Sequence, residues 1–201
     1  MSEFDAKAAT WDQDPMKVER ARTVAQAILE ETGATRETTA FEYGCGTGLL
    51  GFALRPHIAS VTLADSSPGM LAVLRSKVEA SGLDQMTILH LNLESDPVPE
   101  QRFDLVCSLL TLHHIRDTQA ILDRLASLVK PKGFLCVADL DVEDGSFHGP
   151  DADVHRGFDR AWLARRIART GLGDVRFRTV FEIVKSGRTY PVFLAVARRA
   201  A

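Results

Sequence analysis

The stretch FEYGCGTG, residues 41–48, places three alternating glycines directly after a short apolar run. Glycines at such a point let the backbone turn tightly and let a ligand approach without side-chain obstruction. The N–H groups at the start of a following helix can receive an anionic group, here a carboxylate. About twenty residues later, Asp65 ends the next apolar run, where an acidic side chain typically holds ribose hydroxyls. The spacing predicts a strand–loop–helix unit that binds a nucleoside-containing cofactor.

Outward from this loop, short apolar runs alternate with helically spaced ones. In residues 15–31 the apolar side chains recur on one helical face, and Gly33 follows, as glycine commonly follows a helix. Near-continuous apolar strands separated by helices indicate a parallel sheet covered by helices on both faces. We expect helices over 15–31, 49–54, 68–80, 118–129 and 160–170, and strands over 39–43, 60–64, 86–91, 103–109, 134–140, 175–184 and 189–197.

The end of the chain breaks this alternation. Only Lys185-Ser186-Gly187-Arg188 separates the last two expected strands. A connection of that length joins antiparallel strands and is too short for a parallel crossover. The predicted fold is therefore α/β and Rossmann-like: a seven-stranded, mostly parallel sheet with a C-terminal antiparallel hairpin and helices on both faces.

Length and composition are those of a soluble globular protein. The 201 residues fit one large domain, which we expect to span residues 1–201. A net charge of −3 gives no field that would gather nucleic acid or an anionic membrane surface. No apolar run approaches the roughly 20 residues that a membrane span needs, and the acidic N-terminus does not resemble a signal peptide. The three well-separated cysteines fit buried thiols in a reducing compartment, so we expect a cytoplasmic protein.

Two classes of cofactor fit the glycine loop. Residues 46–51, GTGLLG, match the GxGxxG pattern of dinucleotide-binding proteins, whereas residues 42–48 match an acid-x-GxGxG pattern. The acid at Glu42 favours the second pattern, because a carboxylate beside the loop would repel a diphosphate and attract the ammonium of a methionine-like tail. The C-terminal hairpin also suits the sheet of proteins with the second pattern better than the usual sheet of dehydrogenases.

At this point the chain resembles the class I S-adenosylmethionine-dependent methyltransferases, closest to the small-molecule group that includes the quinone-biosynthesis enzymes. The resemblance covers nearly the whole chain, and four motifs in order are more specific than any one of them. The matching segments are residues 42–48, residues 61–71 (VTLADSSPGML), residues 103–108 running to LHHI at 112–115, and residues 130–134 (KPKGF).

The resemblance implies S-adenosylmethionine as the cofactor and gives its contacts. The loop would cradle the methionine part, Asp65 would hold both ribose hydroxyls, and the end of the fourth strand would lie under the sulfonium. Asn92 stands where the family usually has an aspartate, and its amide oxygen can still accept a hydrogen bond from the adenine amino group. The implied cofactor contacts are Trp11, Glu42, Gly44, Cys45, Gly46, Gly48, Asp65, Ser66, Met70, Asn92, Leu93, Ser108, Leu109 and His113.

The start of the chain resembles the lid segment of this group. We therefore divide the domain into a lid and first helix, residues 1–32, and a Rossmann-like core, residues 33–201. An aromatic face at Trp11 could meet a sulfonium or ammonium by cation–π attraction, and it could equally anchor a helix on the core. Leu93 would supply a backbone N–H to the adenine ring.

Several histidines in the second half of the chain are candidates for a catalytic role. The resemblance gives the pair His113 and His114 mainly a pocket-shaping part. If the acceptor is a hydroxyl or an acidic carbon, a general base is useful, and the candidates are His113, His148 and His155, in that order. The acidic and histidine-containing segment over 139–155 suits either a solvated loop or contact with the acceptor. Its spacing follows no known metal pattern, so we expect no metal site.

The sequence thus predicts a methyltransferase that acts mainly by aligning its reactants for in-line displacement. The expected partner is a small-molecule acceptor, with no nucleic acid and no membrane, and the chain would act as a monomer or homodimer. Two alternatives stay open. One is an NAD(P)-dependent oxidoreductase, from the second glycine spacing. The other is a non-catalytic S-adenosylmethionine-binding protein, from the unusual Asn92 and the lack of an obvious base.

Overall fold

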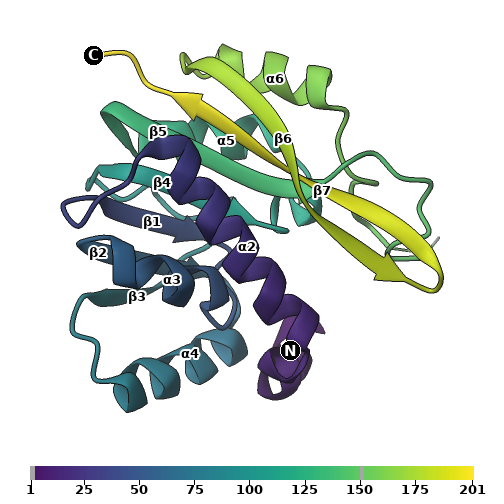
Figure 1. Cartoon of the computed structure of the whole chain (residues 1–201), viewed down its shortest axis with the longest axis horizontal. Helices are drawn as coiled ribbons and strands as arrows, with labels where there is room; N and C mark the ends of the chain where they lie inside the picture. Colours follow the sequence, from purple (N-terminus) through teal and green to yellow (C-terminus); the bar gives the residue numbers. More distant parts are fainter. Residues whose placement is uncertain (1–2, 150–151) are drawn as a thin grey trace.

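The computed structural model describes residues 3–149 and 152–201, and its strands form one seven-stranded sheet in the order β3-β2-β1-β4-β5-β7-β6 (Figure 1). Strands β1 to β5 pair in parallel, whereas β7 is antiparallel to both β5 and β6. This arrangement confirms the predicted sheet and its C-terminal hairpin. The strands are β1 (Thr39–Tyr43), β2 (Ser60–Asp65), β3 (Met86–His90), β4 (Phe103–Leu109), β5 (Val129–Leu140), β6 (Gly173–Lys185) and β7 (Arg188–Arg198).

The helices begin and end at residues suited to those places. Asp14 and Ser67 cap α2 and α4 by accepting hydrogen bonds from backbone N–H groups of the first turn, at 3.0 and 3.2 Å. Gly33 ends α2 in the left-handed conformation, with φ 63°. The helices are α1 (Glu3–Lys7), η1 (Ala8–Gln13), α2 (Pro15–Thr32), α3 (Leu49–Leu54), η2 (Arg55–His57), α4 (Pro68–Ser81), η3 (Leu112–His114), α5 (Thr118–Ser127) and α6 (Arg160–Arg169). None of these helices is long and apolar enough to cross a bilayer.

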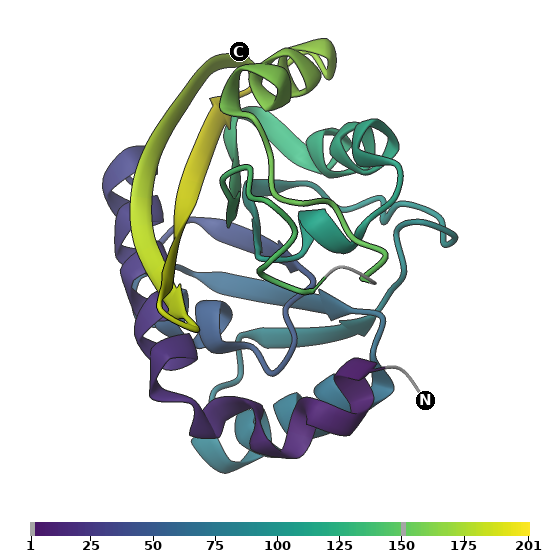
Figure 2. The same cartoon turned by 90° about the vertical axis from the view of Figure 1, so that its right-hand side faces the viewer.

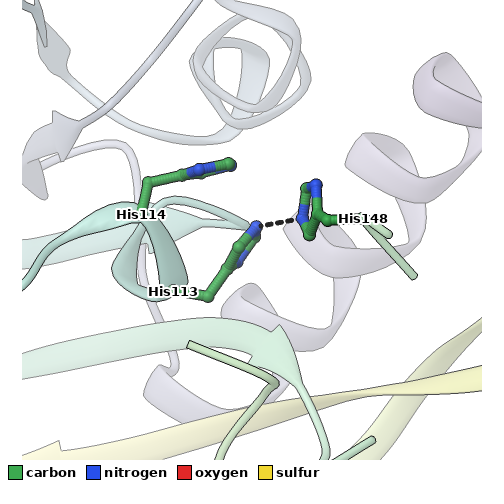
Figure 3. Close-up of side chains that lie close together, drawn as sticks. All are labelled: His113, His114 and His148. Atoms are coloured by element: carbon green, nitrogen blue, oxygen red, sulfur yellow. Dashed lines mark hydrogen bonds between the residues drawn. The ribbon is translucent and has the colours of Figure 1, made fainter. Parts of the chain in front are cut away.

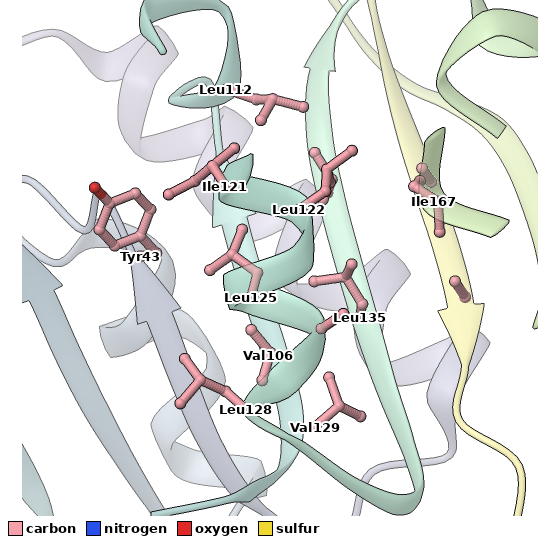
Figure 4. Packing of buried hydrophobic residues seen from close by; sticks show 14 of the residues in the cluster. Tyr43, Val106, Leu112, Ile121, Leu122, Leu125, Leu128, Val129, Leu135 and Ile167 are labelled. Atoms are coloured by element: carbon pink, nitrogen blue, oxygen red, sulfur yellow. The ribbon is translucent and has the colours of Figure 1, made fainter. Parts of the chain in front are cut away.

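Each face of the sheet carries its own hydrophobic core. Helices α2, α3 and α4 cover one face, and α5 and α6 cover the other (Figure 1). Figure 4 shows how α5 sets Ile121, Leu122 and Leu125 over the side chains of Val106 and Leu135 from the sheet. Burial of these side chains from both sides explains why the strands read as near-continuous apolar runs.

The structure departs from the predicted elements in two places. The helix expected over 118–129 ends at Ser127, because the chain pairs again at Val129, opposite Phe103. The segment 130–133, which separates the expected helix over 118–129 from the expected strand over 134–140, lies inside β5 as an irregularity in which Lys132 has φ 66°. Helices α1 and η1 were not predicted, although Phe4, Ala8 and Trp11 recur at helical spacing within residues 3–13.

The carboxyl ends of the parallel strands lie at one edge of the sheet, and Figure 2 shows the N-terminal helices next to this edge. The N-terminal helices lie beside α4 at this edge, where Asp5 accepts hydrogen bonds from the Ser67 hydroxyl at 2.6 Å and the Gly69 N–H at 2.9 Å. The segment that follows β5 reaches the same edge, since the His155 N–H donates to the His113 carbonyl at 2.8 Å. Ligands of open α/β sheets bind at such an edge.

Candidate functional site

The glycine loop joins β1 to α3 and lies against the end of β2. The Gly44 N–H donates to the Ala64 carbonyl at 2.8 Å. The Gly46 N–H donates to Oδ2 of Asp65 at 2.7 Å, and the Ser67 N–H donates to Oδ1 at 2.8 Å. Asp65 therefore ties the loop to β2. Burial raises the pKa of its carboxyl above the ordinary value, although these backbone hydrogen bonds oppose the shift.

Gly44 and Gly46 differ in the space that surrounds a side chain at each position. Gly44 has φ 69°, and a Cβ there would lie 2.3 Å from Cγ2 of Thr111, so no larger residue fits. Gly46 has φ 54°, and the nearest atom to a Cβ there would be Sδ of Met70 at 3.9 Å. The space over Gly46 is therefore a cradle that a side chain would fill and a ligand can enter.

Replacing Gly44 with alanine is expected to destabilise the chain by more than the backbone strain alone. The matched control is Gly33→Ala, because Gly33 has a similar φ of 63° but nothing within 4 Å of a Cβ. Strain should lower the free energy of unfolding by about 1–2 kcal/mol in both variants. The clash with Thr111 should add about 1–3 kcal/mol in Gly44→Ala only. Urea unfolding measures both, and equal losses would show that Thr111 does not pack against the loop.

Glu42 lies beneath the loop and is only 2% exposed. Burial raises the pKa of its carboxyl to about 8, although a backbone hydrogen bond from Gly51 opposes the shift. Its Oε2 has no hydrogen-bond partner among the described residues. The carboxyl is thus mainly protonated at neutral pH. The acid-x-GxGxG pattern was favoured because of a full negative charge at this position, and the folded chain does not carry that charge.

A cavity of about 740 Å³ lies over this edge of the sheet. The glycine loop, the ends of β2 and β4, the N-terminal helices and the segment after β5 all contribute to its wall. The structure brings most of the predicted cofactor contacts together here. Those that line the cavity are Trp11, Glu42, Gly44, Cys45, Gly46, Asp65, Ser66, Met70, Asn92, Leu109 and His113.

Three predicted contacts are not among the described residues that line the cavity: Gly48, Leu93 and Ser108. Gly48 is the N-cap of α3. The Leu93 N–H donates to the hydroxyl of Tyr43 at 3.1 Å, so it already has a partner other than an adenine ring. Ser108 is 3% exposed within β4.

Two lining residues make contacts that the sequence did not predict. The amide oxygen of Asn92 accepts a hydrogen bond from the Glu94 N–H at 3.0 Å, which leaves one lone pair for another donor. The ammonium of Lys17 lies 4.4 Å from the centroid of the Trp11 ring. The cation–π partner of this ring within the chain is therefore a lysine.

Three histidines form a cluster on the cavity wall: His113 and His114 from η3, and His148 from the segment after β5 (Figure 3). Nδ1 of His113 lies 2.6 Å from Oδ1 of the buried Asp139, and its Nε2 lies 3.0 Å from Nε2 of His148. Burial, then the neighbouring imidazoles His113 and His148, lower the pKa of His114 to about 4. Burial also lowers the pKa of His148.

The third candidate base, His155, lies elsewhere. Its Nε2 is 3.0 Å from the Ile115 carbonyl and 3.3 Å from the Thr118 hydroxyl, and it is not among the described residues that line the cavity. The structure therefore brings His113 and His148 to the cavity and leaves His155 as a residue that joins two loops.

Sequence reasoning missed several lining residues, of which Arg20 carries the most chemistry. Arg20 projects from α2, its Nε is buried without a hydrogen-bond partner among the described residues, and burial lowers the pKa of its guanidinium. Met16, Lys17 and Arg20 line the cavity at helical spacing, a signal that was present in the sequence. The hairpin residues Ile183, Val184 and Lys185 also line it, and no local pattern marks them.

Comparison with known proteins agrees with this geometry. Residues 40–133 match the model of a methyltransferase domain. An uncharacterized methyltransferase of Mycobacterium bovis is 35% identical over 111 residues, which are 55% of this chain and 55% of that protein. A ubiquinone biosynthesis O-methyltransferase of Dinoroseobacter shibae is 28% identical over 163 residues, which are 73% of this chain and 65% of that protein. The chain spans about half the length of several curated relatives that it matches.

Solved structures share the fold. A methyltransferase in complex with the Haloferax volcanii Trm112 activator has a TM-score of 0.78 at 20% identity, with 100% of this chain and 99% of that chain covered. The N-methyltransferase NodS of Bradyrhizobium japonicum, solved with S-adenosylhomocysteine, has a TM-score of 0.74 at 17% identity, with 95% and 92% covered.

The sheet order and the glycine loop with Asp65 give a Rossmann-like fold, and the domain matched over residues 40–133 favours a methyltransferase over a dehydrogenase. The comparisons support the class I S-adenosylmethionine-dependent methyltransferases as the family of the domain over residues 40–133. This agrees with the predicted family, enzyme class and cofactor. The comparisons do not favour the alternative of an NAD(P)-dependent oxidoreductase.

Proposed function

We propose that the chain transfers a methyl group to a small-molecule acceptor held in the same cavity as the cofactor. One observation carries the proposal: the glycine loop with Asp65 and the histidine cluster line a single cavity. When bound, S-adenosylmethionine supplies a methyl group on a sulfonium, which the nucleophile of the acceptor displaces in line. The chain contributes chiefly by holding the reactants aligned.

The residues present fit an amino-acid tail joined to a nucleoside. The open space over Gly46 would take the tail, and Asp65 would accept hydrogen bonds from the ribose hydroxyls. Arg20 would pair with the carboxylate of the tail, since it lines the cavity and its buried Nε has no hydrogen-bond partner among the described residues. Met70 and Asn92 would border the adenine.

Arg20→Gln should weaken the binding of S-adenosylhomocysteine about 10- to 100-fold. Loss of a hydrogen bond to a charged group corresponds to about 1.5–3 kcal/mol. The matched control is Arg22→Gln, which removes the same charge from an exposed position on the same helix and should bind as the native chain does. Calorimetric titration measures all three proteins, and equal affinities would remove Arg20 from the site.

Two observations support a small-molecule acceptor. Imidazole and aromatic rings, including those of His148 and Phe147, line the cavity together with the glycine loop. One relative is named as a ubiquinone biosynthesis O-methyltransferase. If the acceptor is a hydroxyl or an acidic carbon, its proton must be accepted. His113 and His148 are the predicted bases that line the cavity, and Asp139 orients the first of them.

The test is a search for the acceptor. The purified chain is incubated with a metabolite extract and an S-adenosylmethionine whose methyl group is isotopically labelled, and mass spectrometry finds the products that carry the label. We expect one labelled class of small molecule that is missing when Asp65→Ala replaces the native chain. A folded chain that binds S-adenosylhomocysteine but labels nothing would instead support the non-catalytic alternative.

We propose further that the chain acts in the cytoplasm as a monomer or homodimer without nucleic acid or membrane. The archaeal structure that shares this fold holds an activator protein, so a required activator is the competing expectation. Light scattering on the purified chain gives its oligomeric state, and the labelling assay on the same sample shows whether it is active without an activator. Activity of the chain alone is the expected result.

A further inference from the structure

The adjacent imidazoles of His113 and His114 meet that of the distant His148 at one point of the cavity wall. One ring nitrogen from each of His113, His114 and His148 can be chosen so that all lie within 4.8 Å of one another. Nε2 of His113 and Nε2 of His148 are 3.0 Å apart. Nitrogen ligands on a tetrahedral zinc ion lie about 3.3 Å from one another, given bonds of about 2.0–2.1 Å. Small side-chain movements would therefore seat an ion between these rings (Figure 3).

The first of these rings is fixed in the orientation that a metal ligand needs. Asp139, at 0% exposure within β5, lies 2.6 Å from Nδ1 of His113 and 3.3 Å from the backbone N–H of the same residue. A carboxylate at Nδ1 holds the proton there and leaves the lone pair on Nε2, which faces His148. Such a carboxylate–histidine pair is the usual support behind a metal-binding imidazole.

Charges around the cluster favour a cation. The carboxylates of Glu3 and Asp139 act electrostatically on His114, and Glu143 acts on His148. The ammonium of Lys185 opposes them at His148. Glu3 forms an ion pair with Lys7. Asp139 and Glu143 therefore remain against the single ammonium of Lys185, and a divalent ion would offset the excess negative charge.

We propose that His113, His114 and His148 bind one divalent transition-metal ion of the zinc class. Three neutral imidazoles suit zinc and its first-row neighbours and do not suit magnesium or calcium, which prefer oxygen ligands. Three protein ligands leave the fourth tetrahedral position open, as in catalytic zinc sites. All three histidines line the cavity, so this position faces the space assigned to the acceptor.

An ion here would change how the acceptor loses its proton, an inference that rests on the proposed function. Without a metal, His113 or His148 would accept the proton of the acceptor. With a metal, an oxygen or nitrogen of the acceptor would occupy the open position, and the positive charge would lower its pKa. The sequence did not predict the site, because 33 residues separate His114 from His148 and the folded chain alone brings them together.

The test is a calorimetric titration of the chelator-treated full chain with Zn²⁺, repeated with Co²⁺ while visible absorption reports tetrahedral coordination. We expect one ion per chain. His148→Ala should weaken Zn²⁺ binding at least about 10-fold, and Asp139→Asn, which touches no ion itself, about 10- to 100-fold. The control His57→Ala removes an exposed histidine from η2 and should leave Zn²⁺ binding unchanged.

Binding of S-adenosylhomocysteine by each variant is measured alongside, so that the two proposals fail separately. A chain that binds S-adenosylhomocysteine but takes up no stoichiometric Zn²⁺ would overturn the metal site. Native-like Zn²⁺ affinity in His148→Ala would overturn it as well. A chain that binds Zn²⁺ at this cluster but no S-adenosylhomocysteine would contradict the proposed function and leave the metal site standing.

Discussion

Asp65→Ala is expected to weaken the binding of S-adenosylhomocysteine at least about a hundredfold while the chain stays folded. In our account the carboxylate accepts two hydrogen bonds from the ribose, each corresponding to about 1.5–3 kcal/mol. The same oxygens accept N–H groups from Gly46 and Ser67, at 2.7 and 2.8 Å, so the substitution also loosens the loop that cradles the tail. Calorimetric titration gives the affinity.

The control for this variant is Asp84→Ala, which makes the same change of charge at an exposed position. Its affinity should match that of the native chain, and thermal melting should show both variants folded. If folded Asp65→Ala binds S-adenosylhomocysteine as tightly as the control does, the ribose is held elsewhere, and the assignment of the cavity is wrong.

The second large effect concerns stability and pH at Glu42. The pKa of this carboxyl is about 8 in the folded chain against an ordinary value of 4.5. Below pH 4.5 the carboxyl is protonated in both the folded and unfolded states, and its contribution to stability is fully present. Between pH 4.5 and 8 the unfolded state loses the proton while the folded state keeps it, so the free energy of unfolding falls as pH rises. The total loss is on the order of 4 kcal/mol.

Glu42→Gln removes this titration and keeps the size of the side chain. We expect the stability of the variant, relative to the native chain, to rise steadily from pH 5 to pH 8 by a few kcal/mol. Urea unfolding at several pH values measures it, and subtraction of the two curves cancels the groups that both proteins share. Parallel curves would mean that Glu42 is ionised in the folded chain and would refute its buried neutral state.

Most of the fold could be predicted because local patterns and tertiary structure agree. The helix over 15–31 and the strand over 39–43 carry apolar spacing, caps and glycine stops that depend only on neighbouring residues. The short link at 185–188 fixed the hairpin by length alone. The irregularity at residues 130–133 of β5 could not be predicted from the sequence. It depends on the pairing of β5 with β4 on both sides of Lys132, which has a positive φ.

The site residues that lie close together in the sequence could likewise be predicted, whereas contacts between distant residues could not. The glycine loop and Asp65 belong to one strand–loop–helix–strand unit, so the sequence predicts that they lie together. Leu93 faces Tyr43 because of a contact between residues 50 positions apart, and no local pattern reports it. The histidine cluster depends on where the segment after β5 returns to the sheet edge, and its support by Asp139 spans 26 residues. Such contacts follow from packing and appear only in the folded chain.

The most direct measurement is a crystal structure of the chain with S-adenosylhomocysteine. Our account predicts the amino-acid tail over Gly46 beside Arg20, the ribose hydroxyls on Asp65, and the sulfur facing the side of the cavity that holds His113. Electron density for the ligand outside this cavity, or a ribose without contact to Asp65, would contradict it.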